Sequence, residues 1–337
     1  MATNDFLTFA GGSGANVLSQ ADYAALTSIL SNGFSSGVAQ SAQVNKVLRQ
    51  ASIMSAVLAQ FAVDLTGKNA VDDGTTASIL AMLKAAVSAQ SLGVVGQCRN
   101  LVINVPAASS TASVTADEII VESALGGQRY CLANFNKTVN LASVGAGGMD
   151  TGSAPASGFV GLYAIFNPTT GASALLAVNA TSAKVPQVYG GANMPTGYTA
   201  SALVSVWSTN ASGQFTVGYQ YDRTREFPIA NALTTSTAQA TPTAFSIASI
   251  VPPNAVSFGG TAATSNNTPS AATSAALSAS AASIGQTNFN VTSATANTGL
   301  SVGFKDMPII TQQTGYYSMA VTAGVGLFSV SVGSYRI

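Results

Sequence analysis

The sequence predicts an α+β fold in which helices and strands are segregated: a helical N-terminal region precedes mainly antiparallel β domains of the β-sandwich type. Two observations lead to this prediction. The spacing of apolar residues changes near residue 93 from about 3.6 residues, the helical period, to about 2, the strand period. Beyond that point, turn-rich stretches separate short apolar runs, as in antiparallel sheets. The expected domains are residues 1–92, 93–230 and 231–337.

The first region contains three expected helices. Ser19 and Asp22 have capping-box spacing and predict a helix over Tyr23–Leu30. Ser41–Leu65 carries apolar residues at steps of three and four, which places them on one helix face. This spacing is closer to about 3.6 than to a strict 3.5 residues, so packing around a threefold axis and packing in a bundle both remain open. Asp72–Asp73 is expected to cap a third helix.

The second region shows the alternation of strands. Ile119–Val121 is a short apolar run, whereas Gly145–Gly148 and Asn167–Pro168 are turn segments. Trp207 ends an apolar run and is expected to be buried. The alternating positions are Leu101, Ile103 and Val105; Val160, Leu162 and Ala164; Ala202, Val204 and Val206; and Phe215, Val217, Tyr219 and Tyr221.

The third region contains no charged residue from Phe227 to Phe304. Its segment Thr261–Ala282 is rich in Ser, Ala and Thr, a composition that is also found in flexible linkers. Strand signals flank this segment, and Phe328, Val330 and Val332 alternate near the last residues. We therefore expect a second β domain.

The composition excludes several classes of protein. Charged residues make up 7% of the chain and the formal net charge is zero, against about 25% charged residues in ordinary domains. Such a surface does not attract a polyanion, so no nucleic-acid partner is expected. No apolar run reaches the roughly 18–20 residues of a membrane span, so no membrane insertion is expected. A neutral, Ala- and Val-rich surface favours self-association, which indicates an obligate oligomer.

No catalytic, cofactor-binding or metal-binding residues are expected. The chain has no histidine, which excludes Ser-His-Asp and Cys-His arrangements. Cys98 and Cys131 are the only cysteines and are too few for a zinc site. We expect two buried thiols, with a single disulfide as the alternative. The glycine runs Gly11–Gly14 and Gly145–Gly148 lack the Lys-Ser/Thr of a phosphate loop and indicate turns.

Three clusters of side chains remain as candidates. Asp117, Glu118 and Glu122 form a carboxylate cluster, which is more typical of a solvated strand end than of a cation site. A mixed-charge cluster predicts a salt-bridged hinge or an inter-subunit contact rather than a substrate site. It consists of Asp222, Arg223, Arg225 and Glu226. Aromatic side chains near the distal end are the candidate receptor-binding residues, with packing between subunits as the alternative. They are Tyr316, Tyr317 and Tyr335.

Several ordered strings resemble the tail fibres and tail spikes of tailed bacteriophages, over about two thirds of the chain. The helical region is similar to an N-terminal fibre module, and the second region to a recurrent tail-fibre β domain. The matching strings are Gln40–Gln50 and Val71–Asp73, then Thr115–Val121, Asn134–Thr138, Gly145–Pro155, Leu162–Thr170 and Tyr189–Tyr198. The third region matches nothing that we recognise.

The resemblance implies a homotrimeric virion component located in the tail and synthesised in the cytoplasm of the bacterial host. Its N-terminal region would attach to tail, collar or baseplate proteins, and its distal part would contact a bacterial surface glycan or protein. Two alternatives remain. A collar or decoration fibre would have no receptor, and a polysaccharide-degrading spike would need paired carboxylates, against which the uncharged stretch argues.

Overall fold

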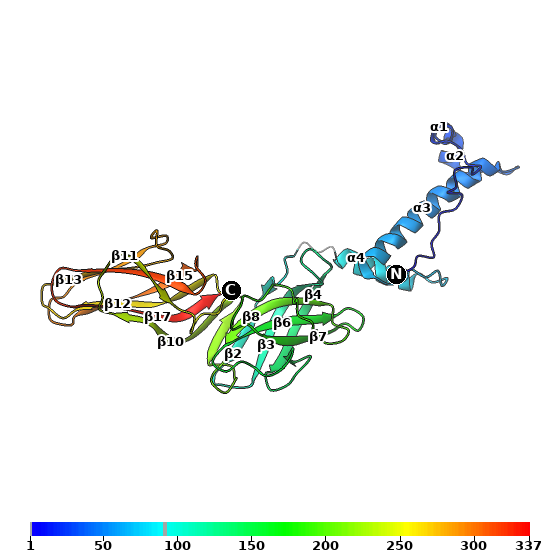
Figure 1. The fold of residues 1–337 in the computed structure, drawn as a ribbon. Coiled ribbons are helices and arrows are strands. Elements are labelled where there is room, and N and C mark those ends of the chain that lie inside the picture. The colour runs from blue at the N-terminus through cyan, green and yellow to red at the C-terminus, as the bar shows by residue number, and fades with distance from the viewer. Residues whose placement is uncertain (1, 90–92) are drawn as a thin grey trace. The chain divides into compact units, whose positions relative to one another are not determined.

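The computed structural model describes residues 2–89 and 93–337. Its contacts divide the chain into two compact units, a helical unit (Met1–Leu92) and a β unit (Gly93–Ile337). Residues 1 and 90–92, which include the expected boundary at residue 92, lie outside the described residues. Among the described residues, every helix belongs to the helical unit and every named strand to the β unit (Figure 1). Helices and strands are therefore segregated along the chain.

The helical unit begins with two short helices, α1 (Gln20–Ala24) and α2 (Thr27–Asn32), in place of the single helix expected over residues 23–30. The chain leaves the helical conformation at Leu26, where ψ is 57°. Ser19 caps α1 as expected, but the Asp22 carboxylate bonds the Ser19 hydroxyl and not the Ser19 backbone amide, as it would in a full capping box. The Ser19 hydroxyl accepts a hydrogen bond from the Asp22 amide at 3.1 Å and donates one to the Asp22 carboxylate at 2.6 Å.

The long expected helix is present as α3 (Ser41–Thr66). Gly67 ends it in the left-handed conformation, and its amide donates to the Val63 carbonyl. The last helix, α4 (Ala77–Ala89), begins after Thr76, so Asp72 and Asp73 do not cap it as expected. Asp73 instead stabilises the turn before α4, because its carboxylate accepts hydrogen bonds from the Thr75 amide and hydroxyl at 2.8 Å.

The β unit contains two sheets within the described residues. The larger sheet has the order β15-β12-β17-β10-β9-β2-β3-β8-β6-β7-β5, with β1 and β4 also paired to β3. The smaller sheet has the order β11-β16-β13-β14. All pairs of named strands are antiparallel except β5 with β7. The strands are β1 (Cys98–Arg99), β2 (Val102–Val105), β3 (Thr111–Glu122), β4 (Arg129–Asn140), β5 (Gly148–Met149), β6 (Phe159–Asn167), β7 (Ala172–Asn179), β8 (Ala200–Ser208), β9 (Gly218–Tyr221), β10 (Thr224–Thr235), β11 (Gln239–Ser246), β12 (Ser257–Asn266), β13 (Ala272–Ser278), β14 (Thr287–Thr292), β15 (Gly299–Pro308), β16 (Thr314–Val321) and β17 (Gly326–Arg336).

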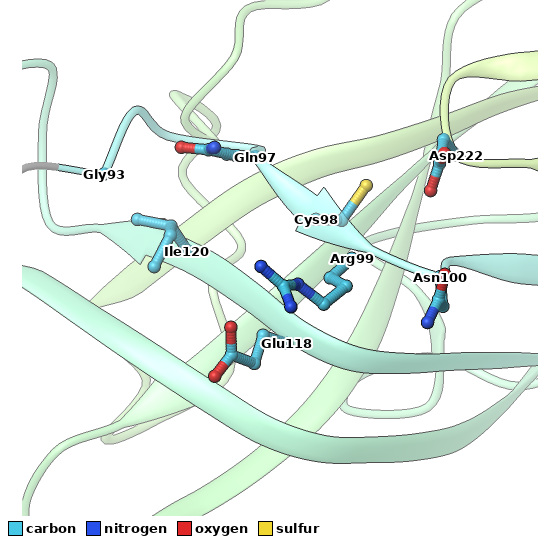
Figure 2. A pocket seen from close by; sticks show the side chains of 8 residues that line it. All are labelled: Gly93, Gln97, Cys98, Arg99, Asn100, Glu118, Ile120 and Asp222. Atoms are coloured by element: carbon cyan, nitrogen blue, oxygen red, sulfur yellow. The ribbon is translucent and has the colours of Figure 1, made fainter.

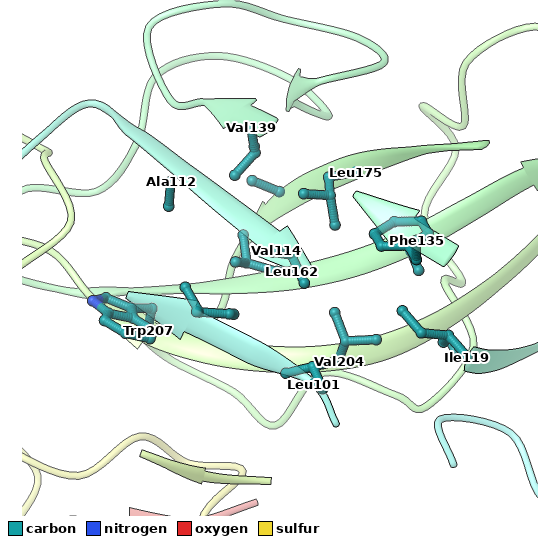
Figure 3. Packing of buried hydrophobic residues seen from close by; sticks show 14 of the residues in the cluster. Leu101, Ala112, Val114, Ile119, Phe135, Val139, Leu162, Leu175, Val204 and Trp207 are labelled. Carbon is teal, nitrogen blue, oxygen red and sulfur yellow. The ribbon is translucent and has the colours of Figure 1, made fainter. Parts of the chain in front are cut away.

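The first half of the β unit packs around strands β6 and β8, which are buried on both faces. One face carries Leu162 and Val204 and belongs to the core shown in Figure 3. The other face carries Tyr163 and Leu203 and belongs to a second cluster. Trp207 is fully buried, as expected, and its indole nitrogen donates to the Thr216 carbonyl at 2.9 Å.

The second half of the β unit is a sandwich. Strands β10, β12, β15 and β17 form one layer and the smaller sheet forms the other, around a core that includes Phe258, Phe289 and Phe328. The alternation of Phe328, Val330 and Val332 is confirmed, because all three side chains lie in this core.

The two halves of the β unit share the larger sheet. Residue 230, the expected boundary between two β domains, lies inside β10, which pairs with β9 at one end and with β17 along its length. The low-complexity segment 261–282 is not a linker, because it contains most of β12 and all of β13. None of the described helices has the length and apolar character required to cross a membrane.

Candidate functional site

Helix α3 presents an apolar surface that its own chain leaves uncovered. Met54 is 58% exposed and Leu58 is 49% exposed, and their neighbours along the same face are also exposed. We call this surface the α3 apolar face. Its members are Val47, Ala51, Met54, Leu58 and Phe61. Their steps of four, three, four and three residues are compatible with a coiled-coil seam over two heptads, although the whole apolar pattern of α3 is closer to the helical period and also allows packing in a bundle.

The side of α3 next to this face packs on a small core. Ala59, Ala62 and Val63 are buried there together with Met82 and Ala86 of α4. Three of these five side chains are alanines, which remove little apolar area from water. Within the described residues, the helical unit nevertheless carries more than half of the large apolar side chains that are exposed. Its own core therefore leaves many of its large apolar side chains exposed.

The β unit has two grooves beside strand β1. The first, which we call the Cys98 groove, has a volume of about 380 Å³. Figure 2 shows that Arg99 and Glu118 come from the neighbouring strands β1 and β3, and that Asp222 lies at the other end of the groove. Arg99 and Glu118 are register partners, so these opposite charges are directly across from one another.

The second groove has a volume of about 390 Å³ and shares Cys98 and Asp222 with the first. It adds Arg223, Asp306 and Arg336. Sequence reasoning did not single out Asp306 or Arg336. Their only local signal is that each is a charged residue in a charge-poor chain, and they reach Asp222 only because β15 and β17 belong to the same sheet as β9.

The thiol in these grooves is a weak nucleophile. Burial, followed by the nearby Asp222 carboxylate, raises the pKa of Cys98, although Arg223 opposes the shift. The thiol therefore stays protonated at neutral pH, and the thiolate is the reactive form. Both cysteines are free. Cys98 is half-buried, but Cys131 is exposed, which differs from the two buried thiols that were expected.

A disulfide between the two cysteines is excluded by the sheet register. Cys98 lies opposite Ile119 and Cys131 lies opposite Ile120, on the two different sides of β3. Two strand spacings separate them, roughly 10 Å, whereas a disulfide requires Cα atoms within about 7 Å.

The mixed-charge cluster is not the salt-bridged hinge that was expected. Within the described residues, no ion pair joins any two of its members. Arg223 instead donates to the carbonyls of Gly96, Leu203 and Ile337 and to the Gln187 side chain. Its guanidinium thereby ties distant segments of the β unit together, because it offers several donors in a fixed geometry.

Arg225 is 1% exposed and lies among aromatic rings. Its guanidinium carbon is 4.2 Å from the centre of the Trp207 ring and 4.8 Å from that of Phe227. It donates to the Thr216 hydroxyl at 2.8 Å and to the Tyr335 hydroxyl at 3.3 Å. Ring faces and hydroxyl groups thus replace the carboxylate partner that the sequence suggested.

The carboxylate cluster is divided by the structure. Glu122 is buried and forms an ion pair with Arg129 at 2.8 Å, and it also accepts a hydrogen bond from the Gly126 amide. Asp117 is exposed and accepts a hydrogen bond from the Asn100 side chain, while Glu118 lines the Cys98 groove. Within residues 2–89 and 93–337, no group of three or more Cys, Asp or Glu side chains is arranged to hold a metal ion.

The three candidate tyrosines occupy different environments. Tyr335 is 2% exposed and donates to the Val206 carbonyl at 2.6 Å, and Tyr317 is 6% exposed and stacks on Phe328. These two are core residues, which corrects their expected place on a receptor-binding surface. Tyr316 lies on the outer face of the smaller sheet, half-buried, with its hydroxyl 3.3 Å from that of Thr311.

Two more exposed tyrosines lie on strand β9. Tyr219 and Tyr221 are each 43% exposed on β9, while Gln220 between them points into the core. The Gln220 side chain accepts from the Ser205 hydroxyl and donates to the Val204 and Asp222 carbonyls. The predicted strand is present only over its second half, from Gly218, and its polar residue is the buried one.

No protein-family model matches this chain, and no curated protein matches it in sequence.

Proposed function

We propose that the chain is a structural subunit of a homotrimeric fibre or spike in the virion tail of a tailed bacteriophage. The observation that carries this proposal is the α3 apolar face, which the chain itself leaves exposed. The resemblance of the ordered strings in the first two regions to tail-fibre proteins supports it. The proposed function is assembly and surface contact, with no cofactor and no nucleic-acid partner.

Self-association through α3 follows from the cost of leaving this face in water. Burying a large apolar side chain stabilises an assembly by about 1.5–3 kcal/mol, and the face carries four of them, Val47, Met54, Leu58 and Phe61. The 26 residues of α3 extend over about 39 Å, since a helix rises about 1.5 Å per residue. The α3 apolar face itself, from Val47 to Phe61, corresponds to about two heptads of a coiled-coil seam.

The proposed fibre has a further partner at each of its two ends. The helical unit would attach to tail, collar or baseplate proteins, and the sandwich half of the β unit would face the bacterial surface. A collar or decoration fibre without a receptor shares the same assembly mode. It differs only in whether the intact trimer binds host cells.

A polysaccharide-degrading spike is the second candidate function. The observation that favours it is the groove that brings Asp222 and Asp306 together, because glycoside hydrolysis uses two carboxyl groups across one cleft. Release of reducing sugars from host surface polysaccharide, abolished by Asp306→Asn, would support this alternative. Equal release by the variant would exclude Asp222 and Asp306 as the catalytic pair.

Sedimentation velocity on the full-length protein tests the assembly proposal. The expected species has three times the 33.6 kDa mass of the chain and the high frictional ratio of a rod. Met54→Glu combined with Leu58→Glu is expected to yield the monomer, since charges in a seam are strongly unfavourable. Gln60→Lys is the matched control, because Gln60 is exposed on another side of α3 and its substitution should leave the trimer intact. A compact wild-type monomer would overturn the proposal.

A further inference from the structure

The outer face of the smaller sheet carries a trough lined by amide and hydroxyl groups. The strand register defines its position. Ala320, Ser274 and Asn290 are opposite one another across β16, β13 and β14, and Ser318, Ala276 and Asn288 form the rung two residues along. The alternate rung, Met319, Ala275 and Phe289, fills the core. Because successive side chains of a strand point to opposite faces, the first two rungs face outward.

The shape of the trough follows from the sizes of these side chains. The two central strands contribute only Ser or Ala, which make a low floor. The flanking strands β14 and β11 contribute longer amides, which make the walls. The resulting hollow has a volume of about 210 Å³. We call it the amide trough, and its polar lining consists of Gln239, Ser274, Gln286, Asn288, Asn290 and Ser318.

The chemistry of the amide trough selects an uncharged ligand that is rich in hydroxyl groups. Each amide side chain offers both donors and acceptors, and each serine hydroxyl offers both as well. No charged residue lies in the trough, nor anywhere from Phe227 to Phe304. An anion or cation would lose its hydration without a counter-charge, which is costly. A protein partner would require apolar or aromatic anchors in the centre of the contact, and the floor offers only small side chains.

Two further contacts fit a sugar ligand. The Gln286 side chain donates to the Asn288 side chain at 2.7 Å, which holds part of the wall in place before binding. Tyr316 lies on the same outer face, opposite Ser278 on the rung after Ser318 and Ala276. Its ring is not part of the trough lining but provides an apolar surface one rung beyond it. An aromatic ring with a polar group suits a ligand that has both apolar and hydroxyl-bearing faces.

We infer that the amide trough binds a segment of a neutral glycan, which lies along β13 and β14 with its hydroxyl groups on the amide walls. From Asn290 to Gln286 the wall extends for roughly 13 Å at about 3.3 Å per residue. The inference rests on the proposed function in one respect, namely that a virion fibre displays this surface to a bacterial cell.

A printed array of neutral and acidic glycans, probed with the full-length protein, tests the inference. Binding is expected on neutral glycans and not on sialylated, sulfated or uronic acid-containing ones. For the best neutral glycan of the array, Asn288→Ala combined with Asn290→Ala is expected to weaken binding roughly tenfold or more. Asn231→Ala is the matched control, because Asn231 is an exposed strand amide of the other layer, and it should bind as the wild type does.

Each outcome has a defined consequence. Absence of binding to any neutral glycan, a preference for acidic glycans, or unchanged binding by the double variant would overturn the inference. A normal melting temperature of the double variant shows that the loss is local. If the wild type sediments as a trimer but binds no neutral glycan, this inference fails and the assembly proposal stands. If the wild type is a monomer that binds neutral glycans, the assembly proposal fails and this inference stands.

Discussion

In the helical unit, the buried cluster consists of alanines with Val63 and Met82, whereas the clusters of the β unit contain Trp207, Phe215 and Phe289. Apart from Val63 and a few partly buried residues, the large apolar side chains of α3 are exposed instead. Strands β6 and β8 show the opposite arrangement, because they are buried on both faces within one chain. The β unit therefore buries its large side chains within one chain, whereas under the assembly proposal further copies would cover the face that the helical unit leaves exposed.

The largest expected effect comes from the same substitution made in both units. Leu162→Ala in β6 removes a fully buried side chain and is expected to lower the free energy of unfolding by about 2–5 kcal/mol, through lost burial and a cavity. Leu58→Ala removes a side chain that is 49% exposed in the single chain. Its effect is expected to stay below about 0.5 kcal/mol in the monomer.

Chemical denaturation at several protein concentrations measures this contrast. The midpoint for Leu162→Ala should fall by the same amount at every concentration. The effect of Leu58→Ala should depend on concentration, since binding to other copies stabilises the folded state by mass action. A large loss for Leu58→Ala that is independent of concentration would show that α3 is buried within its own chain.

Local patterns predicted much of this fold, and long-range contacts account for what they missed. The steps of three and four residues placed α3 correctly, and alternating apolar positions identified β2, β6, β8 and β17. In β6 and β8 these positions mark only one of two buried faces. Alternation could not show that Gln220 is buried between two exposed tyrosines, since that depends on Ser205 in a neighbouring strand. The burial of Tyr335 likewise depends on Val206 and Arg225, which are more than a hundred positions away in the sequence.

The candidate sites were less predictable than the elements. The amide trough draws its walls from β11 and β14 and its floor from β13 and β16. Of the polar lining, only Ser274 lies in the low-complexity segment 261–282, and the other residues carry no local signal of a site. The second groove beside β1 likewise combines Asp222 with Asp306 and Arg336. Only the order of strands in the sheets brings these side chains together.

A smaller effect is expected from alkaline pH, and it should be confined to the β unit. Burial raises the pKa of Tyr335, although Arg225 opposes the shift, and burial also raises the pKa of Tyr163. In the unfolded chain a tyrosine titrates near pH 10, so above that pH the unfolded state loses protons that the folded state retains. The stability that these two tyrosines contribute is therefore fully present below about pH 10, and it is lost as the pH rises through their raised pKa values in the folded state.

Thermal unfolding between pH 8 and pH 11 measures this decline. Tyr335→Phe is expected to cost about 1–3 kcal/mol at pH 8, because the Val206 carbonyl and the Arg225 guanidinium lose a partner. Above pH 10, however, the variant should lose stability less steeply than the wild type. Parallel curves for the two proteins would mean that Tyr335 does not contribute to the alkaline transition.

The smallest expected effect concerns the thiols, and it tests whether the β unit takes part in assembly. Cys131 is exposed on β4 and Cys98 is half-buried, so a thiol reagent should modify Cys131 first, and Cys131→Ser should remove the fast phase. Burial and the nearby Glu118 raise the pKa of Cys131, so its modification should accelerate as the pH rises above 9.

If assembly occurs through α3 alone, the rate of modification at Cys131 should be equal in the trimer and in the monomer made by Met54→Glu with Leu58→Glu. Slower modification in the trimer would place this edge of the β unit in the interface, and the contrast between the two units would then hold only for the isolated chain.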